Sequence, residues 1–440
     1  MKRQSRKVLL FGIVFVLIAG ACAAPVPPTP TPMPTVPAPT ATVPPPTATV
    51  PPPTATVPPT PRPPTAVPTM VPEITPPAVM PPYAVHGPYA VGARNFSVED
   101  GDHVITLTAW YPALNPDNAR EAITYHVADE LSEFRGMTVG GRAIQDAAPD
   151  IAHGPYPLVI FSAGFTDFRQ VSAYLLEHLA SYGLVVLASD PRDRPYWAPA
   201  ATRPIDTKLL ISFADKATAP GGALDGLLDM EHIVAVGYGW NVLIAGGGQF
   251  SLGWCTAHPN FKLLYADSNC GEFLPHAQEI AAQLGLQAVP SGLWPPMNDP
   301  RVKAVIAFAP DGDVWGAEFE GVAIVKVPTL VMAGTWASSN QFGAYPVYEH
   351  LGSAQKGLIK LQEATNFIFS TSCRYAPWYT VACSEPSWDI DQAHAFINHF
   401  VTAFLLTELK GDKEAAKALA PENVSFTGIE YETTGFEAAK

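Results

Sequence analysis

The chain has 440 residues, 48 of them proline, and a formal net charge of −14. Most of the prolines lie between Pro25 and Pro82, so the remainder, roughly 360 residues, has the size of one large α/β domain. Hydrophobic residues make up 48% of the chain and charged residues 15%, which excludes a chain that is disordered throughout. The acidic balance argues against a nucleic-acid partner.

Residues 1–21 are predicted to be a signal peptide. Basic residues at the start precede an apolar run from Val8 to Ala21 that is too short to span a bilayer. The sequence IAGAC, ending at Cys22, resembles a bacterial lipobox, in which the cysteine is lipidated and the chain is cut before it. We therefore expect an extracytoplasmic lipoprotein, anchored at the bacterial cell surface through Cys22. Ordinary secretion with cleavage near Ala24 is the alternative.

Residues 22–82 are predicted to form a disordered tether. Thr-Ala-Thr-Val recurs at Thr40, Thr47 and Thr54 between runs of proline. Proline fixes φ and favours polyproline II at about 3.1 Å per residue. Such a stalk would hold the domain at residues 83–440 on the order of 100 Å from the membrane.

Strand and helix signals alternate along residues 83–440. The strand-like runs are residues 104–110, 158–161, 184–188, 233–236, 302–308 and 329–333. Helical spacing occurs over residues 171–182 and 277–284, after Gln341, and over residues 389–410. The alternation predicts a mostly parallel sheet with helices on both faces. Residues 247–300 form an insertion in the position of a lid.

The cysteines other than Cys22 form two local pairs, Cys255 with Cys270 and Cys373 with Cys383. Their even number and an exported location predict two disulfides that close short loops. Two pairs of free thiols are the alternative. Zinc is disfavoured because the spacing is not that of a metal site, and we expect neither a metal nor a cofactor.

Five blocks of sequence carry a family resemblance. They are PLVIFSAGF at 157–165, YLLEHLA at 174–180, DPRVKAV at 299–305, VPTLVMAG at 327–334 and AHAFINHF at 393–400. Together they resemble α/β-hydrolases of the platelet-activating-factor acetylhydrolase-like and dienelactone-hydrolase-like families, over nearly all of residues 83–436. The resemblance implies an α/β-hydrolase fold and hydrolysis of carboxylic esters by a serine, an acid and a histidine.

The three catalytic positions that the resemblance implies hold other residues. The family's serine lies in Gly-His-Ser-Phe-Gly, whereas this chain has Gly-Tyr-Gly-Trp-Asn, with Gly239 at the nucleophile position. Ala337 stands at the expected acid position, and Asn366 replaces the histidine. An amide cannot act as a base near neutral pH. Asn241 also replaces a glycine, which predicts a relaxed turn.

Several groups near these positions are possible substitutes. Asp311 follows a core strand, and the acid of similar proteins can come from this region; an ordinary acidic loop is the alternative. Ser162 is adjacent to the expected oxyanion site, although a structural role explains it equally simply. The backbone N–H groups of Phe165 and Trp240 are expected to form an oxyanion-hole-like pair, because they do not depend on side-chain identity.

Aromatic and amide side chains are expected to surround the former catalytic centre. The expected lining is Tyr238, Trp240, Asn241, Trp336 and Phe367. An open pocket of this kind suits a small apolar, lipid or glycan ligand, whereas the alternative is that the rings fill it. Two hypotheses remain: a pseudoenzyme that binds a ligand or partner, and an esterase or lipase with a non-standard site.

Overall fold

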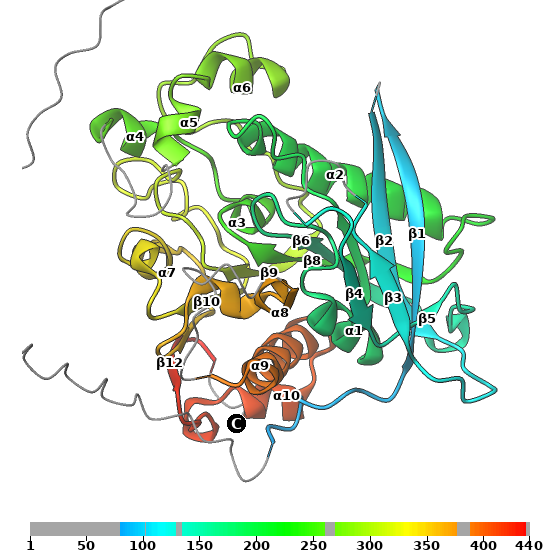
Figure 1. Ribbon diagram of the computed structural model, residues 1–440. Coiled ribbons are helices and arrows are strands. Elements are labelled where there is room, and N and C mark those ends of the chain that lie inside the picture. Colours follow the sequence, from blue (N-terminus) through cyan, green and yellow to red (C-terminus); the bar gives the residue numbers. More distant parts are fainter. Residues whose placement is uncertain (1–79, 102, 129–133, 260–268, 376–387, 437–440) are drawn as a thin grey trace, which may run out of the picture. The chain divides into compact units, whose positions relative to one another are not determined.

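A ten-stranded sheet forms the centre of the domain in this computed structural model, in the order β12-β11-β10-β9-β8-β6-β7-β2-β1-β5 (Figure 1). The strands are β1 (Ala90–Asp100), β2 (His103–Ala113), β5 (Ile144–Gln145), β6 (Tyr156–Ser162), β7 (Val185–Ser189), β8 (Leu228–Tyr238), β9 (Val302–Phe308), β10 (Thr329–Gly334), β11 (Lys356–Leu361) and β12 (Ile429–Thr434). A separate hairpin pairs β3 (Ile123–His126) with β4 (Thr138–Gly141).

The structure describes residues 80–101, 103–128, 134–259, 269–375 and 388–436. The predicted signal peptide, Cys22, the tether up to residue 79, and Cys383 lie outside these ranges. Within them, no helix combines the length and the apolar character needed to cross a membrane.

Six neighbouring strands at the centre of the sheet, from β7 through β6, β8, β9 and β10 to β11, run parallel. Antiparallel strands flank them, with β2 pairing with β7 and β12 pairing with β11. The central strands are apolar on both faces, as expected for a sheet covered on both sides. Because the carboxyl ends of parallel strands lie at one edge, the loops that follow β6, β8 and β9 come together there.

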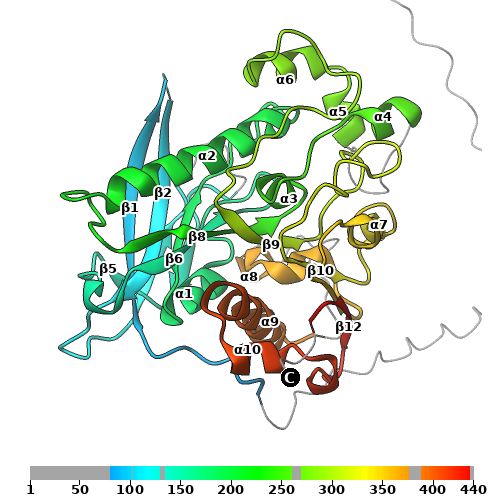
Figure 2. The same cartoon turned by 180° about the vertical axis from the view of Figure 1, so that it is seen from behind.

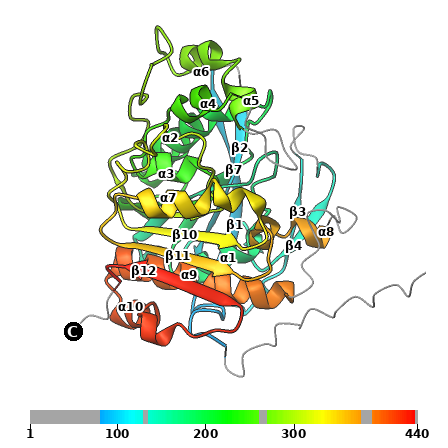
Figure 3. The ribbon, with the colours of Figure 1, turned by 90° about the vertical axis from the view of Figure 1, so that its left-hand side faces the viewer.

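Helices cover both faces of the sheet, which confirms the predicted α/β architecture (Figure 3). One face carries α1 (Ala173–Ser181) and α9 (Ile390–Lys410), with α10 (Lys413–Ala418) packed on α9. The opposite face carries α3 (Asn241–Ala245), α7 (Ala344–His350) and α2 (Pro199–Thr218), which packs against β6, β7 and β8 (Figure 2). The short α8 (Ser372–Tyr375) follows the 3₁₀ turn Asn366–Phe369.

The insertion at residues 247–300 contains three short helices, α4 (Gly253–Ala257), α5 (Asn269–Phe273) and α6 (Ala277–Gln283), grouped beyond α3 in Figure 1. The predicted disulfide between Cys255 and Cys270 is present and links α4 to α5, with the two Cα atoms 4.9 Å apart. Cys373 is also disulfide-bonded, although its predicted partner lies outside the described residues.

Candidate functional site

A pocket of about 440 Å³ opens where β8 and β9 end. Its lining residues are Phe165, Tyr196, Pro199, Arg203, Tyr238, Gly239, Trp240, Asn241, Asn269, Glu272, Phe273, Ala309, Asp311 and Asn366. They come from the end of β8, from the loops after β6, β7, β8, β9 and β11, from α2 and α3, and from α5 of the insertion. The insertion therefore supplies one wall of the pocket, and the aromatic residues leave the pocket open.

The turn after β8 is tight. Gly237 adopts φ of 144°, and a Cβ there would lie 2.1 Å from the carbonyl oxygen of Ser162, so only glycine fits against β6. Gly239 adopts φ of 71°, as a sharp strand-to-helix turn requires. The expectation that Asn241 relaxes this turn is therefore wrong. Asn241 instead begins α3, and its side chain is almost fully buried.

The carboxyl group closest to position 239 belongs to Asp311. A Cβ built on Gly239 would have Asp311 Oδ2 as its nearest neighbour, at 3.5 Å, which is ordinary van der Waals separation. Ala337 does not line the pocket. Its backbone N–H donates to Gly334 O, which closes the turn that follows β10. Of the two predicted acid positions, the pocket thus contains Asp311 and not Ala337.

Burial, and after it the negative charge of Asp313, raise the pKa of Asp311 to about 7. Asp313 lies behind it, only 4% exposed, and accepts a hydrogen bond of 2.8 Å from Asn269 Nδ2. Glu272 also lines the pocket, from α5. The carboxyl groups of Asp311 and Glu272 therefore face the cavity, and the carboxyl group of Asp313 lies beneath that of Asp311.

The loop after β6 presents the expected pair of backbone donors. Phe165 and Trp240 both line the pocket, and neither backbone N–H donates a hydrogen bond within the described part of the chain. The Phe165 side chain is 55% exposed at the mouth, while Trp240 packs inward against Phe250 and Phe273. Two free backbone donors in the same pocket are suited to a neutral acceptor such as a carbonyl oxygen.

Arg203 of α2 fixes this loop, and sequence reasoning missed it. Its Nε and Nη2 form a paired hydrogen bond with the Asp193 carboxylate at 2.9 and 2.6 Å. Its Nη1 donates to Ser162 Oγ at 2.9 Å and to Ala163 O, and its Nη2 donates to Gly164 O at 2.9 Å. All five donors are used. The sequence signal that could have identified Arg203 is a charged residue among the small apolar residues of a buried helix face.

Two amides extend the polar part of the lining. Asn241 donates through Nδ2 to Ser162 Oγ at 3.2 Å, and Asn366 donates to Ser339 Oγ at 3.3 Å. The amide oxygens of both residues are buried and without a hydrogen-bond partner among the described residues. Ser162 itself lies beneath the pocket, where its hydroxyl receives the bonds from Arg203 and Asn241.

The aromatic prediction holds for some residues and not for others. Tyr238 and Trp240 line the pocket, and burial keeps the pKa of Tyr238 well above 10. Trp336 and Phe367 do not line it; they are 46% and 36% exposed on the surface. The backbone N–H of Trp336 donates to Ala364 O, which holds the loop after β10 against the loop after β11. The indole ring lies outside the pocket.

The lining residues limit what chemistry the pocket can do. No Ser, Thr, Cys, Lys or His is among the described residues that line it. The described lining therefore offers no serine or cysteine nucleophile paired with an imidazole base, and its hydroxyls are those of Tyr196 and Tyr238. The site retains hydrogen-bond donors, amides, carboxyl groups and aromatic walls, which are groups that bind a ligand.

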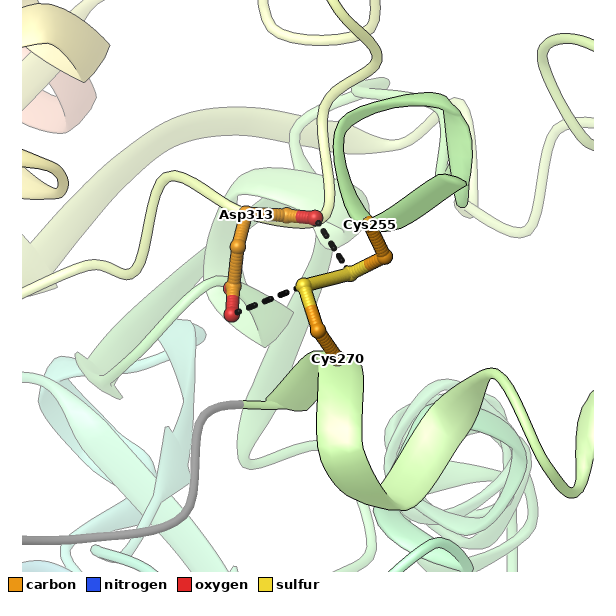
Figure 4. Close-up of side chains that lie close together, drawn as sticks. All are labelled: Cys255, Cys270 and Asp313. Carbon is orange, nitrogen blue, oxygen red and sulfur yellow. Dashed lines mark hydrogen bonds between the residues drawn. A yellow bond between two sulfur atoms is a disulfide. The ribbon is translucent and has the colours of Figure 1, made fainter. Parts of the chain in front are cut away.

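One group of potential metal ligands occurs among the described residues, namely Cys255, Cys270 and Asp313 (Figure 4). The two sulfur atoms are joined to each other, so neither is a thiolate. Asp313 instead supports the disulfide, since its carbonyl oxygen lies 3.4 Å from Cys255 Sγ.

Comparison with known proteins supports the fold. Residues 80–204 match the family model of platelet-activating factor acetylhydrolase, isoform II. A solved ferulic acid esterase from Streptomyces cinnamoneus superposes with a TM-score of 0.51 at 17% identity, over 82% of this chain and 99% of the esterase chain. No curated protein matches the chain. The chain thus has the α/β-hydrolase fold, and the family-model match ends before Gly239.

Proposed function

We propose that the chain is a membrane-tethered lipoprotein whose hydrolase-like domain binds a small ligand without hydrolysing it. The observation that carries the proposal is an open pocket with a glycine at the expected nucleophile position, whose described lining has no serine, threonine, cysteine or histidine. The free N–H pair and the partnerless amides support a binding role, because each needs a hydrogen-bond partner that a ligand supplies. The lipobox-like sequence ending at Cys22 supports the anchor.

Ester hydrolysis tests this proposal. The full chain should hydrolyse 4-nitrophenyl acetate no faster than buffer. Gly239→Ser combined with Asn366→His supplies a nucleophile and an imidazole beside the native Asp311. A side chain at position 239 has room to fit there. The matched control is Gly239→Ala with Asn366→His. We expect the serine variant to exceed the alanine control by on the order of 100-fold.

The second candidate, a carboxylic-ester hydrolase with a non-standard site, rests on Asp311 beside the free N–H pair. It requires turnover by the unaltered chain. Turnover well above buffer that disappears in Asp311→Asn would replace the binding proposal with this one. A silent wild type supports binding, whether or not the rebuilt triad is active.

A further inference from the structure

The electrostatic character of the pocket depends on which of its charges are already neutralised. Arg203, Glu272 and Asp311 are the charged or acidic side chains of the described lining other than the tyrosines. Arg203 uses all five donors within the protein and forms an ion pair with Asp193, which is 1% exposed. Arg203 is therefore unable to hold an anionic ligand, and its charge is balanced before a ligand arrives.

The two acidic groups have no such partner. Glu272 forms no ion pair within the described residues, and no lysine lines the pocket there. The groups that face Asp311 are Asp313 from its own loop, Asn269 and Glu272 from α5, and the neutralised Arg203 from α2. The uncompensated charge of the cavity, from Glu272 and from Asp311 once it ionises, is therefore negative, while burial raises the pKa of Asp313 beneath it and so disfavours the charged form of that carboxyl.

The walls around these carboxyl groups are aromatic. The rings of Phe165 and Tyr196 lie 5.3 Å apart at the mouth, where they are 55% and 40% exposed. Deeper in the pocket, Trp240 meets Phe273 edge-on. The Arg194 guanidinium lies 4.8 Å from the centre of the Tyr196 ring and donates to its hydroxyl, so a cation already occupies one face of this ring and the other aromatic walls are left for a ligand. Aromatic faces beside carboxylates are the lining that suits an organic cation.

A buried amide next to the pocket has an unpaired acceptor. Asn241 lines the pocket, is only 4% exposed, and has an Oδ1 atom without a hydrogen-bond partner. A buried acceptor left unpaired costs about 1–3 kcal/mol, and a ligand N–H group would satisfy it. The carboxyl groups, the amide and the aromatic walls all match the same chemistry.

We infer that the ligand of this pocket is a small organic amine cation with an apolar body, held by Asp311 and Glu272 and packed between the aromatic walls. This inference rests on the proposed binding function and specifies the ligand class for it. The ammonium group donates to the carboxylates and to Asn241, while the apolar body lies against Phe165, Tyr196 and Trp240.

Calorimetric titration of the full chain with three ligands of similar size tests the inference. The ligands are 2-phenylethylammonium, the neutral 2-phenylethanol and the anion phenylacetate. We expect the ammonium to bind at least about tenfold more tightly than the alcohol, as a charge-assisted hydrogen bond predicts, and the anion to bind most weakly. Because the pKa of Asp311 is about 7, the ammonium affinity should rise between pH 6 and 8 as this carboxyl ionises.

Three variants locate the effect. Asp311→Asn and Glu272→Gln should each weaken ammonium binding about tenfold and leave alcohol binding unchanged. Glu279→Gln, which removes a charge from exposed α6 outside the pocket, should change neither. If Asp311→Asn fails to fold, Glu272→Gln still tests the inference. Glu272 has no partner among the described residues, so its replacement breaks no contact of the fold.

Two results would overturn the inference. Alcohol or phenylacetate binding as tightly as the ammonium would exclude a cation site while leaving a ligand-binding protein. Failure of all three to bind would also overturn it. Neither result involves ester turnover by the wild type, which is the outcome that contradicts the proposed function itself.

Discussion

Arg203 is the residue that links the helix layer to the pocket. Its guanidinium joins α2 to three consecutive residues of the loop after β6 and pairs with the buried carboxylate of Asp193. Asp193 also accepts a hydrogen bond of 2.8 Å from Thr166 N. One ion pair thus holds both ends of the loop that presents the Phe165 N–H, so the loop conformation does not depend on a ligand.

Removing this guanidinium should be costly. Arg203→Met keeps most of the side-chain volume but leaves Asp193 charged and unpaired at 1% exposure. We expect the free energy of unfolding to fall by about 3–5 kcal/mol, measured by urea denaturation at pH 7. The control is Arg301→Met, which removes ion pairs with Asp215 and Asp299 at the surface, each contributing no more than about 1 kcal/mol. Equal losses in the two variants would contradict the role given to Arg203.

Some residues of the site could be predicted from short sequence motifs, and others could not. Gly239 and Asn366 lie in short motifs next to strand ends, so their placement at the pocket could be predicted from the sequence alone. Arg203, Asp193 and Glu272 come from a helix, a loop and the insertion, and only folding brings them together. Trp336 was misplaced because a residue's position after a strand does not determine where its side chain points.

At the scale of helices and strands, the elements that could be predicted from the sequence are those made of apolar residues. β6, β7, β9 and β10 are buried apolar runs, and each expected strand matches one of them to within a residue or two at its ends. In contrast, α2 went unpredicted because it buries Arg203, Asp206 and Thr207 and so has no continuous apolar stripe. β1 was missed because its second half alternates between partly and fully exposed positions at the edge of the sheet.

The layer formed by α1 and α9 contains three buried histidines, His178, His394 and His399. His394 stacks on Tyr174, with ring centroids 3.5 Å apart, and one ring nitrogen lies 3.3 Å from Ser370 O. Burial lowers the pKa of His394 to about 3, and the positive charge of Arg374 contributes to the shift. Burial likewise lowers the pKa of His178 and of His399 to about 4.

These shifts predict a loss of stability in acid. The unfolded chain protonates His394 near pH 6.5, whereas the folded chain does so only near pH 3, so the unfolded state binds more protons in between. Its contribution to the free energy of unfolding therefore falls by about 1.4 kcal/mol per pH unit below 6.5. His394→Gln removes this term.

The prediction concerns the difference between the wild type and His394→Gln. Their free energies of unfolding, from urea titrations, should converge by about 2–3 kcal/mol between pH 7 and pH 4.5. Carboxyl groups with raised pKa values, such as Glu177, act in the opposite direction in both proteins and cancel in the difference. Parallel pH profiles would show that His394 is not held neutral.

Across the whole molecule, the family model and the solved esterase match different lengths of the chain. The family-model match covers residues 80–204, which contain the first strands and the loop with Phe165. The glycine at the nucleophile position and the asparagine at the histidine position both lie beyond it. The later strands nevertheless complete a sheet that superposes on an esterase over most of the chain. The shared fold thus extends over more of the chain than the family-model match does.

The N-terminal segments determine where such a domain acts, and Cys22 is the residue to test. In a bacterial host, the full chain should incorporate an alkyne-labelled fatty acid and sediment with membranes. Cys22→Ser should abolish both. The matched control is Cys22→Ser with Met33→Cys, which keeps a cysteine in the tether but places it outside the lipobox-like sequence. This control should stay unlabelled, because lipidation needs the residues before Cys22 as well as the thiol.

The alternative, ordinary secretion, gives a different N-terminus. A lipoprotein begins with a modified Cys22, whereas cleavage near Ala24 leaves a free amino group at or near Pro25. Mass spectrometry of the N-terminal peptide therefore distinguishes the two independently of the label. An unlabelled wild type that begins near Pro25 would make this a secreted binding protein. Its proline-rich segment would then no longer act as a tether, while the inferred pocket chemistry would be unaffected.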